Sequence, residues 1–395
     1  MKIIHTSDWH LGHTLYGYDR GAEQGSMLEQ IEGIVREERA DALVVSGDIF
    51  HNGAPSSAVQ TLFTKAVMRM HEASPETVVI ITAGNHDSAA RHEISRVLWE
   101  TQNVHMIGSV DKEDIEAQTI EIPGKGFVVA VPYINERSIP DGFWQGLSDS
   151  ERSRDEAVGG TDGNLLPVIL SAHLTVSGSD FTGHEDVREF SVGGIDSVDM
   201  AELGDGWDYV ALGHIHHAQT LRGSGGRVRY SGTPLPVSFD EIYPHSVTMV
   251  EIARHGDKPV ISEIPIDNPH PLVTLLTEGF KPWEEVRNLV SAFPKDNPAY
   301  IRLNVEVEDI LPPDAINEAR RMLADGKARF CLVNARRGKA AKEGGGSLTV
   351  SEFRAMAPLE VARMYAEDIG RVFDDEMEDL FREIEKEVRD SERKS

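Results

Sequence analysis

Residues 1–12 read MKIIHTSDWHLG and residues 42–50 read ALVVSGDIF. Each stretch is a short apolar run rich in Val or Ile that ends in a polar segment with glycine, a pattern typical of strands covered on both faces. Three further runs end in the same way, at Gly84-Asn85-His86-Asp87, Ser171-Ala172-His173 and Gly213-His214-Ile215-His216. The sequence therefore predicts an α/β fold in which polar side chains follow several buried strands.

Helical periodicity fills the gaps between the first three strands. Apolar residues recur every three or four positions over Glu23–Arg36 and over Ser56–Ala73, so we expect a β-α-β-α-β arrangement with parallel pairing. The polar, glycine-rich stretch Asp149–Gly163 predicts a loop. Shorter runs over Val228–Ser231 and Val247–Ile252 predict hairpin strands that complete a second sheet.

A length of 395 residues predicts two or three domains. The composition changes near Asn268-Pro269-His270-Pro271, so we expect a main domain over residues 1–268 and a small α/β domain over residues 269–335. Residues 336–348 combine basic side chains with three consecutive glycines and predict a flexible linker. Residues 349–395 predict a helical tail whose apolar stripe docks on a partner.

The composition restricts the class of protein. Asp and Glu total 66 against 39 Lys and Arg, a formal charge of −27, whereas proteins that hold DNA alone are usually basic. Either the substrate is not DNA, or metals and a partner supply the positive surface. Cys331 is the single cysteine, which excludes an intramolecular disulfide and a thiolate zinc cluster. No stretch resembles a signal peptide or a membrane span, so we expect a cytoplasmic location without a membrane partner.

The polar strand ends predict a metal site. Neighbouring strands lie about 5 Å apart, so residues beyond the same ends of several strands converge on one pocket. Carboxylate, amide and imidazole groups are the donors that a pair of divalent ions requires. The candidate ligands are Asp8, His10, Asp48, Asn85, His173, His214 and His216.

The candidates differ in the roles that their chemistry suits. Asp48 is the best bridge between two ions, as the lone acid of its strand end. The two-residue spacing of Asp8 and His10, and of His214 and His216, puts both members on one side of an extended segment. Asn85 offers a neutral oxygen. His86 need not bind metal and is the candidate catalytic residue, protonating the leaving oxygen, with Asp87 to orient it.

His51 is open to two interpretations. It follows Phe50 in the same loop as Asp48. A contact with substrate and a histidine satisfied by its own loop are about equally compatible with that position.

These motifs resemble the calcineurin-like metallophosphoesterases. The segments His5–Gly12, Ser46–Phe50, Ser171–Thr175 and Arg229–Pro234 are similar to the SbcD family of bacterial nuclease subunits, over about the first 265 residues. The resemblance implies a two-sheet sandwich flanked by helices, a small α/β capping domain and a helical C-terminal tail. It implies two bound divalent ions, which are expected to be manganese, and a catalytic role for His86. One ion would be held by Asp8, His10, Asp48 and His216, and the other by Asp48, Asn85, His173 and His214.

The resemblance also implies an activity and partners. Members are double-strand 3′ to 5′ exonucleases and single-strand and hairpin endonucleases that process DNA ends in repair and recombination. They form homodimers through helices near the nuclease site, and heterotetramers with an SbcC-like SMC ATPase. Two rival functions remain open: a phosphatase or phosphodiesterase acting on a non-DNA phosphoester, and a non-catalytic scaffold, which the seven intact ligands disfavour.

Overall fold

The computed structural model describes most of the chain. The described residues are 1–111, 115–135, 139, 142–158, 165–183, 197–338, Leu359, Arg363, Met377, Glu378 and Phe381. The chain divides into two compact units, Met1–Glu306 with Leu311–Arg336, and Val307–Ile310 with Arg337–Ser395. The first unit contains all of the candidate metal ligands.

A six-stranded sheet carries the first three candidate motifs. Its order is β14 (Val260–Pro265), β13 (Ser246–Glu251), β1 (Lys2–Thr6), β4 (Ala42–Ser46), β5 (Val78–Thr82) and β6 (Val104–Ile107). The last four strands of that order are parallel. Every residue of β4 and β5 is buried, as expected for strands covered on both faces.

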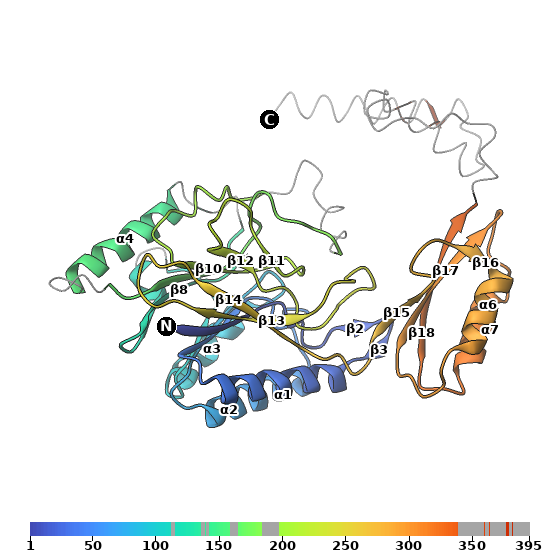
Figure 1. Cartoon of the computed structure of the whole chain (residues 1–395), viewed down its shortest axis with the longest axis horizontal. Coiled ribbons are helices and arrows are strands. Elements are labelled where there is room, and N and C mark those ends of the chain that lie inside the picture. Colours follow the sequence, from blue (N-terminus) through green and yellow to red (C-terminus); the bar gives the residue numbers. More distant parts are fainter. Residues whose placement is uncertain are drawn as a thin grey trace. The chain divides into compact units, whose positions relative to one another are not determined.

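Two long helices cover one face of this sheet. They are α1 (Gly21–Glu38) and α2 (Ser57–Ala73), which pack together below the sheet in Figure 1. The side chain of Ser56 caps α2 by accepting a hydrogen bond from the backbone N–H of Val59. The apolar stripes predicted for both helices lie in the core with strands β4 and β5. A shorter helix, α3 (Ala89–Glu100), follows β5.

A second six-stranded sheet carries the other two motifs. Its order is β11 (Gln219–Thr220), β12 (Val228–Tyr230), β10 (Tyr209–Gly213), β9 (Val168–His173), β8 (Gly126–Val131) and β7 (Thr119–Ile122), with the 3-10 helix Ile115–Gln118 before β7. Its apolar face packs directly on the first sheet, where Ile3 and Val44 share a buried cluster with Ile169 and Ala211. The predicted two-sheet sandwich flanked by helices is therefore confirmed.

Two expectations for this part of the chain are only partly right. Strand β12 joins the second sheet and pairs antiparallel with β11, as predicted, but β13 completes the first sheet, where Val250 pairs with Ile3 in an antiparallel ladder. Apolar alternation identifies a strand but not its partner. The stretch from Asp149 is not a loop at its start, since helix α4 spans Phe143–Val158. Phe143 and Trp144 bury the beginning of this helix against the second sheet, and helix-forming residues continue it.

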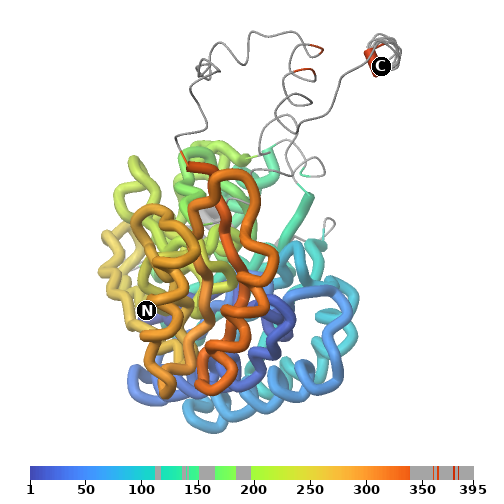
Figure 2. Tube along the Cα trace, turned by 90° about the vertical axis from the view of Figure 1, so that its right-hand side faces the viewer, coloured from blue at the N-terminus to red at the C-terminus, as the bar shows by residue number. Residues whose placement is uncertain are grey.

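A smaller α/β arrangement follows, orange in Figure 2. Its sheet contains β15 (Leu272–Leu275), β17 (Tyr300–Val307), β16 (Lys281–Pro282) and β18 (Arg329–Arg337), with helices α6 (Trp283–Ala292) and α7 (Ala315–Leu323). This mixture of strands and helices agrees with the small α/β domain expected there, whereas the boundary at residue 268 stays a prediction. A short hairpin of β2 (Thr14–Leu15) and β3 (Tyr18–Asp19) comes between β1 and α1 in the sequence.

The predicted linker and tail mostly lie outside the described residues. Only residues 336–338 of the linker are described, together with the five single residues of the tail. Among all described helices, none combines the length and the apolar character needed to cross a membrane.

Candidate active site

Loops at the carboxyl ends of β1, β4 and β5 are held together by backbone hydrogen bonds. The N–H of Asp8 donates to the carbonyl of Gly47 at 2.9 Å, and the N–H of His10 donates to the carbonyl of Asp48 at 3.0 Å. The N–H of His86 donates to the Asp48 carboxylate at 2.9 Å. The first three motifs thus form one rigid loop cluster.

The backbone is left-handed at four of the seven candidate ligands. Asp8 has a φ of 53°, His10 of 44°, Asp48 of 52° and His214 of 93°. The expectation that Asp8 and His10 alternate along an extended segment is therefore wrong, because the chain turns at each of them to meet the loop after β4. Such strained positions persist only where the surrounding structure enforces them, and they gather at functional sites.

Two glycines in the motifs leave no room for a side chain. A Cβ on Gly47 would lie 2.1 Å from Nδ1 of His173, and Gly47 has a φ of +84°. A Cβ on Gly84 would lie 2.1 Å from Oδ1 of Asp48. Glycine is required before Asp48 and before Asn85, because the side chain of another candidate ligand packs directly against the glycine backbone at each position.

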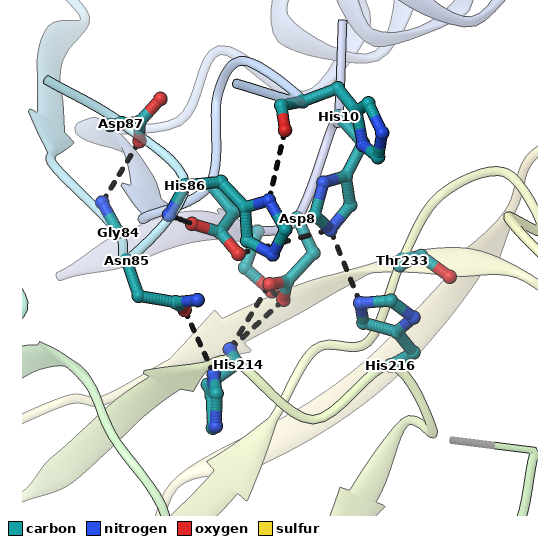
Figure 3. A network of polar contacts seen from close by, with 12 residues as sticks. Asp8, His10, Gly84, Asn85, His86, Asp87, His214, His216 and Thr233 are labelled. Carbon is teal, nitrogen blue, oxygen red and sulfur yellow. Dashed lines mark hydrogen bonds and ion pairs between the residues drawn. The ribbon is translucent and has the colours of Figure 1, made fainter. Parts of the chain in front are cut away.

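One group of candidate ligands forms around two facing imidazoles. Nε2 of His10 lies 3.2 Å from Nε2 of His216, and Figure 3 shows the two rings pointing toward one another. Donor atoms of Asp8, His10 and His216 all lie within 4.8 Å of one another. Oδ2 of Asp48 is 3.8 Å from Nε2 of His10.

A second group shares Asp8 with the first, and Asp48 contacts members of both. Oδ2 of Asp48 lies 3.5 Å from Nε2 of His173, and donor atoms of Asp8, Asp48 and His173 lie within 4.8 Å of one another. Oδ1 of Asn85 is 3.0 Å from Nε2 of His173 and 3.1 Å from Nδ1 of His214, the latter contact visible in Figure 3. All seven predicted ligands are therefore brought together, with Asp48 between the two groups.

The donor set fits a pair of divalent cations. The facing nitrogens of His10 and His216 can share only one proton. Carboxylate oxygens of Asp8 and Asp48 lie beside these imidazoles. Oxygen and imidazole donors gathered in this way suit manganese, zinc, iron or magnesium.

Burial and charge set the protonation of the donors. Burial lowers the pKa of His214 to about 3 and also lowers the pKa of His10. Burial alone would lower the pKa of His173, but the Asp48 carboxylate beside it raises that pKa to about 9. The same contact with His173 outweighs burial at Asp48 and holds the pKa of its carboxyl well below the ordinary value. His173 would therefore release a proton on binding a cation.

His86 is oriented by a backbone carbonyl. Its Nδ1 lies 2.9 Å from the carbonyl oxygen of His51. The carboxylate of Asp87 accepts instead from the N–H groups of Ile49, Phe50 and Gly84, so the expectation that Asp87 orients His86 is wrong. Asp87 holds the two ligand loops together, because both of its oxygens are needed for backbone donors.

The side chain of His51 lies against this cluster. Its ring stacks beside that of His86, with 5.7 Å between centroids, and its donor atoms lie within 4.8 Å of those of His10 and His86. The structure thus brings His51 to the site without assigning it a role.

Two residues that support the ligands were missed in the sequence. The hydroxyl of Ser7 donates to Oδ2 of Asp8 at 2.5 Å, and Oε1 of Glu241 lies 3.0 Å from Nδ1 of His216. Ser7 is adjacent to a ligand and could have been found by its position. Glu241 follows no strand end, and nothing in the sequence connects it with His216.

The geometry agrees with a comparison with known families. Residues 1–218 match the family model described as calcineurin-like phosphoesterase. The chain belongs to this family. It is accordingly a phosphoester hydrolase with a site for two divalent ions, as predicted, whereas the metal and the ligands of each ion remain proposals.

Similar proteins indicate which branch of the family the chain belongs to. The chain is 33% identical to the SbcD subunit of the nuclease SbcCD from Rhodobacter capsulatus, over 72% of this chain and 74% of the relative. It is 30% identical to the Bacillus subtilis counterpart, over 81% and 83%, and 28% identical to the Escherichia coli counterpart, over 79% of each. The predicted membership of the SbcD family of nuclease subunits is confirmed.

One solved structure shows a looser likeness. A dimetal phosphatase from Danio rerio covers 66% of this chain and 98% of its own length, at 12% identity and a TM-score of 0.38. That alignment is too loose to add to the assignment.

Proposed function

We propose that this chain is a manganese-dependent DNA nuclease that degrades duplex ends in the 3′ to 5′ direction and cuts single strands and hairpins. One observation carries the proposal. Donor groups from five strand ends form two groups around Asp48, in a chain that covers about three quarters or more of relatives named as nuclease subunits. DNA end processing in repair and recombination is the role that follows.

The distances support one ligand set for each ion. We assign Asp8, His10, Asp48 and His216 to the first ion, since their donor atoms cluster around the facing imidazoles. The contacts of Asn85 with His173 and His214 favour a second ion, held by Asp48, Asn85, His173 and His214.

The side chains and backbone around the metal ligands would position the water and deliver a proton. When bound, the two divalent ions would supply an activated water and neutralise charge on the phosphate. The carbonyl of His51 can only accept a hydrogen bond, so Nδ1 of His86 carries a proton and Nε2 faces the site. In its imidazolium form His86 delivers the Nε2 proton to the leaving oxygen, while the His51 carbonyl stabilises the positive ring.

A direct assay separates this proposal from a phosphatase acting on another phosphoester. Purified chain with manganese is given a linear DNA duplex labelled at either end, and in parallel a phosphomonoester. We expect cleavage of the duplex from its 3′ ends, abolished by a chelator. Activity confined to the monoester would reject the nuclease assignment.

The acidic balance of the chain favours a partner. With a formal charge of −27, the chain has little positive surface with which to hold DNA by itself. We propose that an SbcC-like SMC ATPase supplies that surface in a heterotetramer, and that residues 349–395 dock on it. Such a role would place the chain in the cytoplasm. Co-purification with the ATPase, followed by nuclease assays with and without ATP, tests the pairing.

One exposed helix face supports a homodimer. Ile94, Val97 and Leu98, at positions i, i+3 and i+4 of α3, share one face of the helix and are 83%, 75% and 74% exposed. Exposed apolar side chains grouped in this way indicate an interaction surface. The helix begins three residues after His86, so a dimer through this face would lie beside the site. We expect Ile94→Glu to produce monomers in sedimentation experiments, and Ile310→Glu, at an isoleucine that is 75% exposed, to leave the dimer intact.

A further inference from the structure

Glu241 is a buried carboxylate that contacts a candidate metal ligand. Its side chain has no exposed surface, and its Oε1 lies 3.0 Å from Nδ1 of His216. Its Oε2 accepts from the hydroxyl of Thr233 at 3.0 Å and from the N–H of Val237 at 3.3 Å. A buried charge is retained only where its hydrogen bonds are made, and here one of them ends on the imidazole.

We propose that Glu241 is a positioning residue for the metal ligand His216, an inference that rests on the ligand set proposed above. The carboxylate can only accept, so it fixes the proton on Nδ1 of His216 and keeps the lone pair on Nε2. That Nε2 faces Nε2 of His10 at 3.2 Å. A carboxylate behind the ring also makes the imidazole a stronger donor to a cation.

The small α/β domain holds the residues immediately before Glu241. Arg302 of β17 contacts Oδ1 of Asp240 at 2.6 Å and donates to the carbonyl of Phe239 at 3.2 Å. Its guanidinium also lies 5.2 Å from the centre of the Phe239 ring, within the range of a cation–π contact. The contacts of Arg302 with Phe239 and Asp240 therefore help to hold Glu241 in place. Through Glu241 they support the orientation of His216.

The chain offers a matched control for a purely structural role. Asp208 is also buried, and its Oδ2 lies 2.9 Å from Nδ1 of His255 and 2.8 Å from the backbone N of Val168. This pair resembles Glu241 and His216 in its hydrogen bonds, but neither member belongs to the ligand groups. Loss of its charge should lower stability without changing metal affinity.

Calorimetric titration of metal-free protein with Mn²⁺ tests the proposal. Glutamine at position 241 places an N–H₂ group against one of two sets of donors, so it cannot satisfy both. We expect Glu241→Gln to weaken one of the two manganese sites about 10- to 100-fold, with the other little changed. Asp208→Asn should bind both ions as the wild type does, and His216→Ala should lose the same site.

The outcomes are distinguishable. If Glu241→Gln binds both ions with wild-type affinity while His216→Ala loses one, the positioning role is wrong and the ligand set stands. If His216→Ala itself retains both sites, the ligand assignment fails and the inference fails with it. Circular dichroism shows whether each variant folds. Should Glu241→Gln not fold, Glu241→Asp keeps the charge but shortens the reach, and normal manganese affinity in that variant overturns the proposal.

The contribution of the small domain has its own pair of variants. Arg302→Ala removes the contacts with Phe239 and Asp240. Arg287→Ala instead breaks the 2.6 Å ion pair between Arg287 and Glu318, which lies within the small domain. We expect weaker manganese binding at the site of His216 only for Arg302→Ala. Equal affinity in the two variants would show that the small domain does not support Glu241.

Discussion

Alanine at Gly47 is the sharpest test of how tightly the site is packed. Gly47 has a φ of +84°, and a Cβ there would lie 2.1 Å from Nδ1 and 2.5 Å from Cγ of His173. The ring cannot turn away freely, because its Nδ1 also lies 2.8 Å from the carbonyl oxygen of Ser46. The substitution should therefore strain the backbone and displace a metal ligand at once.

The magnitude follows from these two effects. A left-handed conformation costs a residue with a Cβ about 1–2 kcal/mol, and overpacking costs about 1–3 kcal/mol. We expect Gly47→Ala to lower the free energy of unfolding by about 2–5 kcal/mol, the sum of these ranges. Gly178 is the matched control, since its φ is +89° with no atom within 4 Å of a Cβ. Gly178→Ala should lose only about 1–2 kcal/mol.

Urea unfolding of the two variants without metal measures these losses, and manganese titration measures the displacement of His173. We expect Gly47→Ala to lose affinity at one of the two manganese sites, and Gly178→Ala to bind both ions normally. Equal losses of stability in the two variants, together with normal manganese binding by Gly47→Ala, would refute the close packing of Gly47 against His173.

Three further predictions concern the metals. Asp48→Ala should lose both ions in elemental analysis, whereas His86→Ser should keep both and lose about 10²- to 10⁴-fold in duplex cleavage; normal cleavage by the latter would remove His86 from catalysis. Although burial opposes it, Asp48 raises the pKa of His173 to about 9. Below that pH the metal-free ring is protonated, so manganese affinity should fall by about tenfold per unit as the pH drops. Calorimetry in two buffers checks the released proton, and an affinity independent of pH would contradict it. Removing the ions should lower the thermal midpoint, since they bind only the folded state; an unchanged midpoint would argue against ligation by the native fold.

The sequence predicted much of the fold because its strands are buried on both faces. Continuous apolar runs such as those of β4 and β5 identify strands, and helical periodicity between them requires parallel pairing. The same signal could not place β13, because strand partners depend on contacts between distant segments. Nor did it reveal the helix from Phe143, whose charged second half resembles a loop in composition.

The motifs in the sequence predicted which residues form the candidate site. They did not predict the backbone geometry of that site. All seven candidate ligands come together in the structure, as expected for side chains at or just beyond the ends of neighbouring strands. The left-handed turns at Asp8 and His10 and the role of the His51 carbonyl depend on backbone conformation, which residue spacing does not specify. Glu241 was missed because a carboxylate that acts through another side chain needs no motif of its own.

Diffraction from crystals grown with manganese, measured at the manganese absorption edge, would show whether Asp48 bridges two ions. We expect two anomalous peaks per chain about 4 Å apart, both within bonding distance of the Asp48 carboxylate, with His10 and His216 at one and His173 and His214 at the other. A single peak, or two peaks that do not share Asp48, would contradict this bridging role.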